Sequence, residues 1–432
     1  AQAALEANAS LPEPAWCRQA PAFGRVQVGT NALAVPADTH HEDNTHFLIY
    51  AVSTLAEQTS PAVFAIYDAD ATVSGIRFHG KDLDDDHLGG TIFWEPPENM
   101  LRVQSYAVYF AMDAGGSQRS QIEHEVTAGT DRLFLPLETH RHFSHFVVYT
   151  RSALVEQTTP ASTPVDDEFT RVLGLRFADE DLDQGEVGGD VVWQFPDDTS
   201  EVVEYIVYMA EDAVGAGRLR LGAAAPGDDA FRVPADTPLA SFTHLAVYAR
   251  SDLAEQTTPA VFQIQDEIAS ASGVEFTDKD LDASQLGGRV AWKAPDTSDR
   301  LRAYVVYLAS GPGGAGRSQV GLAVGVGANF TDVPPETAVA SHRFVLVYTK
   351  SRLFEQSTPA YFALLDRVSR VRSPAFPDRD LDQLDLGGTL SWTEPPDISQ
   401  VVRYNVYMAT VAQMVDGVAV CPGGPGGSGP PG

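Results

Sequence analysis

The chain is poor in cysteine, in basic residues and in long apolar runs. Two cysteines among 432 residues, Cys17 and Cys421, are too few for a disulfide-stapled scaffold or a tetrathiolate zinc site. The 29 Lys and Arg residues face 59 Asp and Glu residues, so the formal net charge is -30. This charge opposes binding to nucleic acid or to an anionic membrane surface, because both need a basic footprint. No apolar run is long enough to predict a membrane span.

Motifs of catalysis and export are also missing. The sequence contains no nucleophile elbow, zinc-protease motif, phosphate loop or dinucleotide fingerprint. The recurring acidic pairs belong to a repeated turn, and small domains in a row are not expected to provide a glycosidase cleft. We therefore expect a chain that is not an enzyme. The sequence begins without methionine or a signal-like segment, and we interpret it as a mature or excised chain.

What the sequence does contain is a long tandem repeat. One marker is a tryptophan that recurs at spacings of 99, 99 and 100 residues: Trp94, Trp193, Trp292 and Trp392. A second marker is the segment EQ(T/S)(T/S)P, which begins with the same spacing at Glu57, Glu156, Glu255 and Glu355. A period near 99 residues is the size of a whole domain, far longer than a helical-repeat unit. The chain is therefore predicted to be an array of similar domains.

Hydrophobicity within each unit has a period of two residues. In the segment YVVYLA, the residues Tyr304, Val306 and Leu308 fall on one face, and the position of Val305 varies between the units. This pattern is typical of a half-buried β-strand. Other short β-branched and aromatic runs are bounded by Gly, Pro, Asp and Ser, and helical periodicity is absent. Each unit is predicted to be an all-β sandwich.

Two segments carry a family resemblance. The segment TLSWTEPPDISQVVRYNVYMA, 389–409, resembles the B and C strands of a fibronectin type III domain. The segment VPPETAVASHRFVLVYTKSRLFEQSTP, 333–359, is similar to the E–F corner, F strand and F–G loop of that family, although the tyrosine corner is replaced. The resemblance implies two packed sheets of about seven strands. The expected fold class is all-β, a tandem array of immunoglobulin-like or fibronectin type III-like sandwiches.

The repeat boundaries predict three complete units between two half-units. The complete units are 71–168, 169–268 and 269–368. Residues 22–70 form only the C-terminal half of a unit, and residues 369–420 form only the N-terminal half. An N-terminal extension, 1–21, and a Gly/Pro-rich tail, 421–432, flank them. The tail has Gly-X-Y spacing, which fits a polyproline-type stem or a flexible linker.

A half-sandwich exposes an apolar face and unpaired strand edges. Three explanations stay open: a window of a longer array, completion of one chain by the next, or closure of one chain into a ring. Completion between copies is a heterologous contact, which makes a filament unless it closes. Cys17 and Cys421 lie near the broken ends of the two halves, so they form either an intersubunit disulfide or two free thiols.

An acidic phrase, D-x-D-L-D before a Gly-Gly pair, recurs in three units, and a fourth copy has Gly80 in place of the first aspartate. Three carboxylates at alternate positions resemble the opening of a calcium loop, and the F–G loop of an adjoining unit is expected nearby. We predict that Glu255 approaches Asp179, Asp181 and Asp183 from the following unit. The competing interpretation is a solvated acidic turn whose aspartates cap backbone amides. The candidate calcium ligands are Asp82, Asp84, Asp179, Asp181, Asp183, Asp278, Asp280, Asp282, Asp378, Asp380, Asp382, Glu156, Glu255 and Glu355.

Two further recurring sets suggest surface contacts. Arg119, Arg218 and Arg317 could pair with those aspartates, but we expect surface ion pairs that contribute little stability. A second set points away from the predicted core and is expected to pair with the F-strand tyrosines: Tyr109, Tyr208, Tyr307 and Tyr407. Asn8 and Asn329 stand in N-glycosylation sequons, which act only in a secreted chain.

Two functional classes fit these features. The first is a structural subunit of an extracellular rod or filament, such as a flagellar hair, an extruded fibre or a surface coat. It would polymerise head to tail with copies of itself and be stiffened by calcium. The second is a cell-surface adhesion or ligand-binding stalk that holds a glycan or a surface protein through its loops. The near-identity of the units and the two half-units favour the first.

Overall fold

The computed structural model describes residues 22–167, 169–296, 299–408, 413–415 and 418–420. The chain divides into two compact units, Ala1–Phe169 and Thr170–Gly432, which are described separately. Every regular element in the described residues is a β-strand. Among these residues no helix is long and apolar enough to cross a membrane. The predicted extension 1–21 and tail 421–432, with Asn8, Cys17 and Cys421, lie outside the described residues.

The first compact unit contains the repeat 71–168, which folds as two antiparallel sheets. One sheet has the order β3–β4–β8, with β3 Ser74–Gly80, β4 His87–Glu95 and β8 Arg132–His140. The other has the order β10–β9–β5–β6, with β10 Ala161–Pro164, β9 His145–Arg151, β5 Ser105–Ala111 and β6 Ser120–Gln121. The short strand β7, Val126–Thr127, also pairs with β5. In the second sheet β9 lies between β5 and β10, so the spatial order of those strands differs from their order along the chain.

The second compact unit repeats this arrangement twice. In the repeat 169–268, one sheet comprises β11 Leu173–Phe177, β12 Glu186–Gln194 and β15 Ala230–Pro238. Its partner sheet comprises β14 Leu219–Ala224, β13 Glu204–Ala210, β16 His244–Arg250 and β17 Ala260–Gln263. In the repeat 269–368, the three-stranded sheet comprises β18 Ser272–Phe276, β19 Gln285–Lys293 and β23 Phe330–Ala338. Facing it are β21 Ser318–Gln319, β20 Ala303–Ala309, β24 Phe344–Lys350 and β25 Ala360–Ala363, with β22 Val324–Gly325 on β20.

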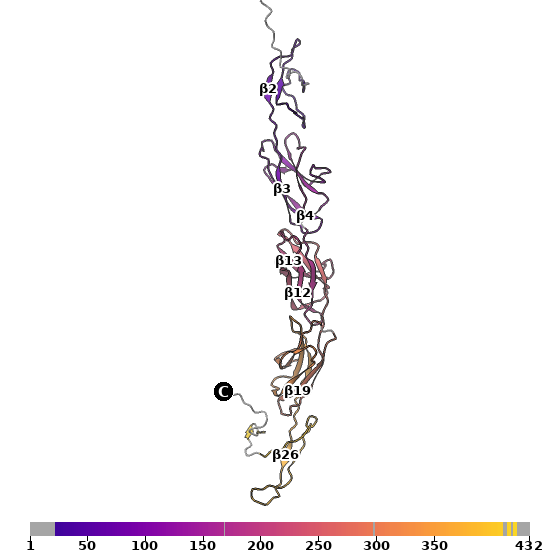
Figure 1. Ribbon diagram of the computed structural model, residues 1–432, viewed down its shortest axis with the longest axis vertical. Coiled ribbons are helices and arrows are strands. Elements are labelled where there is room, and N and C mark those ends of the chain that lie inside the picture. The colour runs from indigo at the N-terminus through magenta and orange to yellow at the C-terminus, as the bar shows by residue number, and fades with distance from the viewer. Residues whose placement is uncertain (1–21, 168, 297–298, 409–412, 416–417, 421–432) are drawn as a thin grey trace, which may run out of the picture. The chain divides into compact units, whose positions relative to one another are not determined.

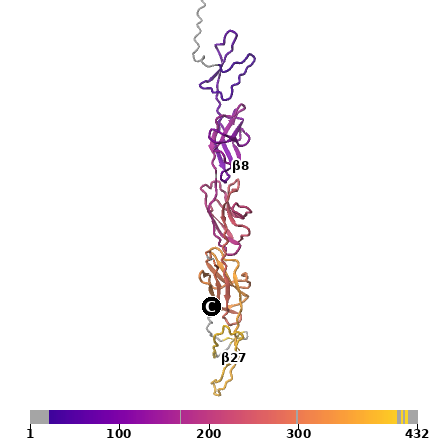
Figure 2. The same ribbon diagram turned by 90° about the vertical axis from the view of Figure 1, so that its right-hand side faces the viewer.

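This strand order confirms the predicted fold. In each complete repeat the first, second and fifth strands form one sheet, such as β3, β4 and β8. The third, fourth, sixth and seventh form the other, such as β5, β6, β9 and β10, with the fourth at one edge. This is the arrangement of an immunoglobulin-type sandwich of the fibronectin type III kind. Figures 1 and 2 show that the strands of each complete repeat gather into a sandwich of their own. The chain is therefore a tandem array of all-β sandwiches.

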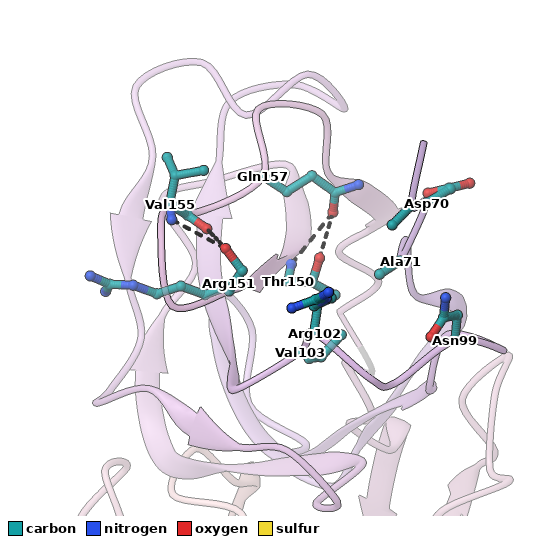
Figure 3. Close-up of a pocket in the computed structure, with 11 residues that line it drawn as sticks. Asp70, Ala71, Asn99, Arg102, Val103, Thr150, Arg151, Val155 and Gln157 are labelled. Atoms are coloured by element: carbon teal, nitrogen blue, oxygen red, sulfur yellow. Dashed lines mark hydrogen bonds between the residues drawn. The ribbon is translucent and has the colours of Figure 1, made fainter. Parts of the chain in front are cut away.

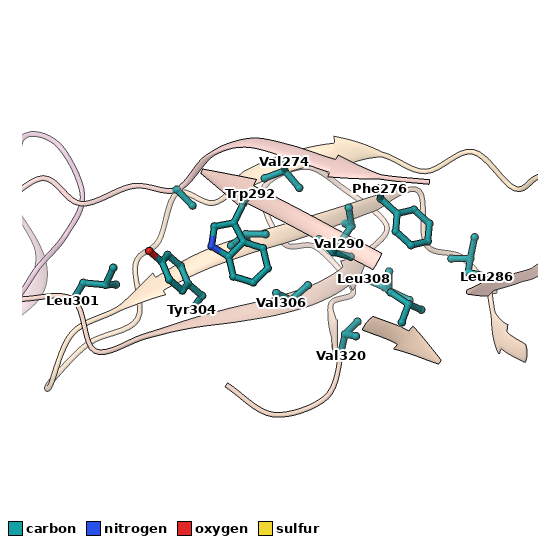
Figure 4. Close-up of a cluster of buried hydrophobic side chains, with 14 of the residues drawn as sticks. Val274, Phe276, Leu286, Val290, Trp292, Leu301, Tyr304, Val306, Leu308 and Val320 are labelled. Atoms are coloured by element: carbon teal, nitrogen blue, oxygen red, sulfur yellow. The ribbon is translucent and has the colours of Figure 1, made fainter. Parts of the chain in front are cut away.

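The core of each repeat lies between its two sheets. In the repeat 269–368, Trp292 on β19 contacts Tyr304 on β20, with ring centroids 5.1 Å apart. Val290 and Val306 are buried beside them, and Figure 4 shows their side chains converging from the two layers. The same Trp–Tyr contact recurs at 5.4 Å and 5.6 Å in the other complete repeats. The two recurring aromatic residues thus fix the packing of sheet on sheet.

One prediction about these strands was wrong. The alternate position of the third strand was expected to be a variable, half-buried face, but Ala107, Ile206 and Val305 are all buried. A second, smaller apolar cluster covers this outer face, in the last complete repeat around Ala309, Leu346 and Tyr348. The position varies in sequence because its cover tolerates several apolar side chains, not because it faces water.

The half-units form less regular structure. In 22–70, β1 His46–Ile49 pairs with β2 Ala62–Ala65. In the C-terminal half, β26 Arg372–Ala375 pairs with β27 Ser391–Thr393. Further along, β28 Gln413–Val415 pairs with β29 Val418–Val420. Each half therefore carries only part of the strands of a complete repeat.

Candidate functional site at the repeat joint

The first aspartate of the acidic phrase organises the loop that contains it. Asp179 Oδ1 accepts hydrogen bonds from the backbone N–H groups of Asp181 and Gly188, both at 3.0 Å. Its Oδ2 accepts one from the backbone N–H of Glu267, at 3.0 Å, where the chain leaves the repeat. Asp278 makes the same three contacts in the next repeat. Burial raises the pKa of Asp179 to about 7, although these three N–H donors act in the opposite direction.

The second aspartate ties this loop to the turn before the sixth main strand. Asp181 Oδ1 accepts the backbone N–H of Asp183 at 3.0 Å, and Oδ2 accepts that of Asp236 at 2.7 Å. Asp236 has a left-handed backbone, with φ of 57°. Equivalent bonds join Asp82 to Glu138 and Asp280 to Glu336. Because these aspartates are buried, the prediction of a solvated turn was wrong for the complete repeats, whereas the loop of Asp378 and Asp382 is exposed; amide capping by aspartate is observed in both.

The first unit lacks the leading aspartate, and its strand is correspondingly longer. Gly80 stands where Asp179 and Asp278 stand in the other repeats. There β3 continues to Gly80, which pairs with Gly90, whereas β11 and β18 stop at Phe177 and Phe276. The aspartate carboxylate therefore competes with the strand ladder for backbone N–H groups.

The third aspartate reaches the following repeat. Asp183 Oδ2 accepts the backbone N–H of Ser357 at 2.5 Å, and Oδ1 accepts that of Thr358 at 3.0 Å. The Thr358 hydroxyl also donates to Asp183 Oδ1. Ser357 and Thr358 belong to the EQSTP loop of the repeat 269–368, while Asp183 belongs to 169–268. Two repeats of the second compact unit are therefore joined by charge-assisted hydrogen bonds.

The leucine inside the acidic phrase crosses the same joint. Leu182 is only 1% exposed and belongs to the apolar core of the repeat that follows it, with Ala269 and Leu301. Its backbone carbonyl accepts the N–H of Ala269 at 3.2 Å. Leu281 repeats this carbonyl contact with Ser369. The D-x-D-L-D phrase therefore combines a loop scaffold of aspartates with an apolar plug.

An ion pair flanks the plug. Arg352 of the later repeat lies 3.7 Å from Glu180 and 3.6 Å from Asp190 of the earlier one. The backbone N–H of Arg352 also donates to Glu180 at 3.2 Å. Because the Arg352 side chain is more than half exposed, this pair adds specificity more than stability.

The predicted glutamate ligands lie elsewhere. Glu255 belongs to the same repeat as Asp179 and faces the outer surface of the four-stranded sheet. Its Oε2 accepts the Tyr208 hydroxyl at 2.8 Å, and its Oε1 lies 2.8 Å from Arg218 Nη2. Glu156 and Glu355 make the same contacts with their own arginine and tyrosine. The prediction that Glu255 joins Asp179, Asp181 and Asp183 was therefore wrong. The recurring arginines pair with these partly exposed glutamates and not with the aspartates.

Each of these glutamates holds an arginine between two tyrosine rings, an arrangement named here the tyrosine clamp. The Arg218 guanidinium lies 4.6 Å from the ring centroid of Tyr208 and 4.3 Å from that of Tyr248. The two rings meet edge to face at 5.4 Å, which confirms the predicted cross-strand pairing. Gly215 is required because an added Cβ would come within 2.0 Å of the Tyr248 hydroxyl. Arg119 and Arg317 form the same clamp.

Three of the acidic loops gather carboxylates in sets that could hold a cation. Each set contains the second and third aspartates of the phrase and the left-handed acidic residue, with ligand oxygens within 4.8 Å of one another. Neighbouring carboxylates and, above all, burial raise the pKa values of Glu138, Glu186 and Asp236. The sets are Asp82, Asp84 and Glu138; Asp181, Asp183, Glu186 and Asp236; and Asp280, Asp282 and Glu336.

The remaining predicted site residues that the structure describes are the aspartates of the last acidic loop and the sequon residue Asn329. Asp378 Oδ1 keeps its bonds to the N–H groups of Asp380 and Gly387, both at 3.0 Å, although this loop is exposed. Asp382 donates its N–H to Asp380 at 3.0 Å. The carbonyl of the sequon residue Asn329 accepts the N–H of Trp292 at 3.1 Å, beside the start of β23.

Comparison with known proteins finds similar folds only among solved structures. No protein-family model and no curated protein sequence matches this chain. Among solved structures, the FN1–FN3 domains of chicken CNTN1 match 68% of this chain and 98% of theirs, at 12% identity and a TM-score of 0.23. That likeness is too distant to carry an argument. The assignment of a tandem fibronectin-like sandwich protein rests on the strand order of the three complete repeats.

Proposed function

We propose that this chain is a structural subunit of an extracellular rod or filament, in which the half-sandwich 369–420 of one copy completes the half-sandwich 22–70 of the next. The main support is the exposure of residues that complete repeats bury. Ile49 is 66% exposed, whereas Val148, at the same repeat position, is 0% exposed. Val406 is 58% exposed, whereas its counterpart Val306 is 1% exposed. In a complete repeat these two positions lie opposite each other on adjacent strands of the four-stranded sheet, as Val108 and Val148 do, so each half exposes core residues that the other half would cover.

The tyrosine clamp is divided between the halves in the same way. Tyr407, on the C-terminal half, is highly exposed and corresponds to Tyr208. The other members stand on the N-terminal half. Tyr50 and Glu57 correspond by repeat spacing to Tyr248 and Glu255, and Arg25 stands in a segment, GRVQVG, that resembles GRSQVG around Arg317. Joining the halves brings together one complete clamp. This division favours a partner that is a second copy of the chain over an unrelated protein.

The aspartate contacts are divided too. Asp380 corresponds to Asp181, which binds the N–H of a left-handed acidic residue in its own repeat. The matching left-handed residue of the broken unit is Asp38, with φ of 58°, on the other half. A joined pair of halves therefore restores the loop scaffold as well as the core. The contact is heterologous, and repetition of it builds a filament.

Calcium is part of the proposal as a stiffener of the joints. Each acidic set places three or four carboxylates within 4.8 Å of one another, and calcium prefers several such oxygens. A divalent cation there would offset the repulsion that contributes to the raised pKa values of Glu138 and Asp236. The proposal assigns no catalytic role to the chain.

Sedimentation velocity of the full chain over a range of concentrations tests this function. We expect species that grow with concentration beyond the 46.4 kDa chain. Ile49→Asp changes the N-terminal half-unit and Val406→Asp changes the C-terminal half-unit. Each is expected to abolish concentration-dependent assembly, because it places a charge in the core that the two halves would form. Phe134→Asp, at a 51% exposed apolar residue on β8 of a complete repeat, is the matched control and is expected to assemble normally. A monomeric wild-type chain at every concentration would contradict the proposal and favour a stalk.

A further inference from the structure

The first complete repeat has an open cavity at the pole where its chain begins. The cavity measures about 210 Å³, and Figure 3 shows its lining residues, which include Ala71, Arg102, Val103, Val155 and Gln157. An engineered apolar cavity of about 150 Å³ already admits benzene, so this space accommodates a leucine side chain.

The equivalent place in the repeat 269–368 is filled. Ala269 and Leu301 correspond to Ala71 and Val103, and both pack in one core cluster with Leu182 of the preceding repeat. Gln356 corresponds to Gln157, and its side-chain amide donates to the Leu182 carbonyl at 3.4 Å. Residues 1–70 contain no D-x-D-L-D phrase.

One such phrase has an exposed leucine. Leu381 is 97% exposed, although the surrounding aspartates already hold the loop in the conformation seen around Leu182. Leu182, by contrast, is 1% exposed with its receiving repeat in place. The described residues therefore include one exposed leucine of this phrase, Leu381, and one open cavity at the position that Leu182 fills in the repeat 269–368.

We propose that Leu381 of one copy inserts into the cavity lined by Ala71, Val103 and Gln157 of a second copy. This inference rests on the proposed head-to-tail assembly and adds a second contact to it, one repeat beyond the completed sandwich. Asp382, like Asp183, then caps the backbone N–H groups of the F–G loop, here at Thr158 and Thr159.

The charges around the two surfaces are compatible. Two arginines and one aspartate, Arg102, Arg151 and Asp70, line the cavity, so its lining is net basic. The incoming loop carries three aspartates and one arginine and is net acidic. The ion pair between Glu180 and Arg352 has no counterpart, because Arg379 and Ala153 stand at those two positions. Because Arg379 would face the uncharged Ala153 at this contact, the exchange creates no pair of like charges.

The test compares Leu381→Ala with Leu384→Ala in the full chain by sedimentation velocity. Leu384 is 95% exposed on the same loop, but its counterparts Gly185 and Ser284 are exposed in complete repeats, so it is a matched control. We expect Leu381→Ala to weaken association roughly ten- to a hundredfold, the effect of burying one leucine, and Leu384→Ala to leave it unchanged. Ala71→Leu, which fills the cavity, is expected to weaken association as Leu381→Ala does.

The possible outcomes separate the two proposals. If wild type assembles and the two leucine variants weaken it equally or not at all, half-sandwich completion stands and the plug is overturned. If wild type does not assemble, both proposals fail. If Leu381→Ala lowers the melting temperature of a monomer instead of weakening association, the plug occupies its own chain and a second copy is excluded as the occupant.

Discussion

Replacing Leu182 by alanine should destabilise a repeat other than the one that contains it. Leu182 belongs by sequence to 169–268 but is 1% exposed within the core of 269–368. Leucine-to-alanine changes at buried sites cost about 2–5 kcal/mol, from lost burial and from the cavity left behind. We expect a loss in this range, and we expect it in the later repeat. A joint built only from surface hydrogen bonds would show a loss under about 1 kcal/mol.

Hydrogen exchange of the full chain is the suitable assay, because an array of domains has no single unfolding transition. The amides of β20 and β24 should exchange roughly 30-fold faster or more in Leu182→Ala, since about 1.4 kcal/mol corresponds to a factor of ten. Leu381→Ala removes the same side chain from the same motif where it is 97% exposed, so no stability change is expected in dilute solution. Faster exchange confined to β12 and β13, or no change, would refute the placement of Leu182.

Four further predictions concern the joint and the clamp. Arg218→Ala should lower the stability of its repeat by about 1–2 kcal/mol, because it removes two cation–π contacts, and an unchanged melting temperature would contradict this. Asp183→Asn should speed exchange at Ser357 through loss of about 1–3 kcal/mol of hydrogen bonding, whereas Asp382→Asn should not do so in dilute chain. Because the pKa of Asp179 rises from 3.8 to about 7 on folding, its contribution to stability is present below pH 4 and is lost as pH rises to 7, so melts should show a decline that Asp179→Ala removes. Millimolar calcium should raise the melting temperature relative to EGTA, and equal melts in the two buffers would exclude the cation.

The array and the sandwich could be predicted from the sequence. The recurring Trp292 and Tyr304 positions set the period, and both residues lie in the core contact between sheets. The alternation of apolar residues was sufficient to predict strands, because a strand exposes its two faces to different surroundings. The pattern did not reveal that the outer face is also covered.

The partners of the charged residues could not be predicted from the sequence. Glu255, Arg218 and Asp179 recur with the same period, so their recurrence does not show which pairs meet. Their partners depend on which end of the sandwich each loop occupies, and the loop of Glu255 folds back over its own sheet. One signal was available: Arg, Glu and two tyrosines recur together in every complete unit, and both half-units together contain one such set.

The role of Leu182 was also hidden. The leucine inside the D-x-D-L-D phrase makes the phrase less similar to a calcium-binding loop, and the sequence alone does not explain why an apolar residue stands there. The structure supplies the reason, because the buried contact lies in the next repeat. Contacts between domains leave no periodic pattern within a strand, so they are absent from predictions based on periodicity.

The most direct test of head-to-tail completion is to mix two variants, one with a charge in the N-terminal half-unit and one with a charge in the C-terminal half-unit. Ile49→Asp retains an intact C-terminal half, and Val406→Asp retains an intact N-terminal half. Each alone should remain a monomer, and an equimolar mixture should form a one-to-one dimer that grows no further. If the mixture stays monomeric while wild type assembles, or if either variant assembles alone, completion of one half-sandwich by the other is contradicted.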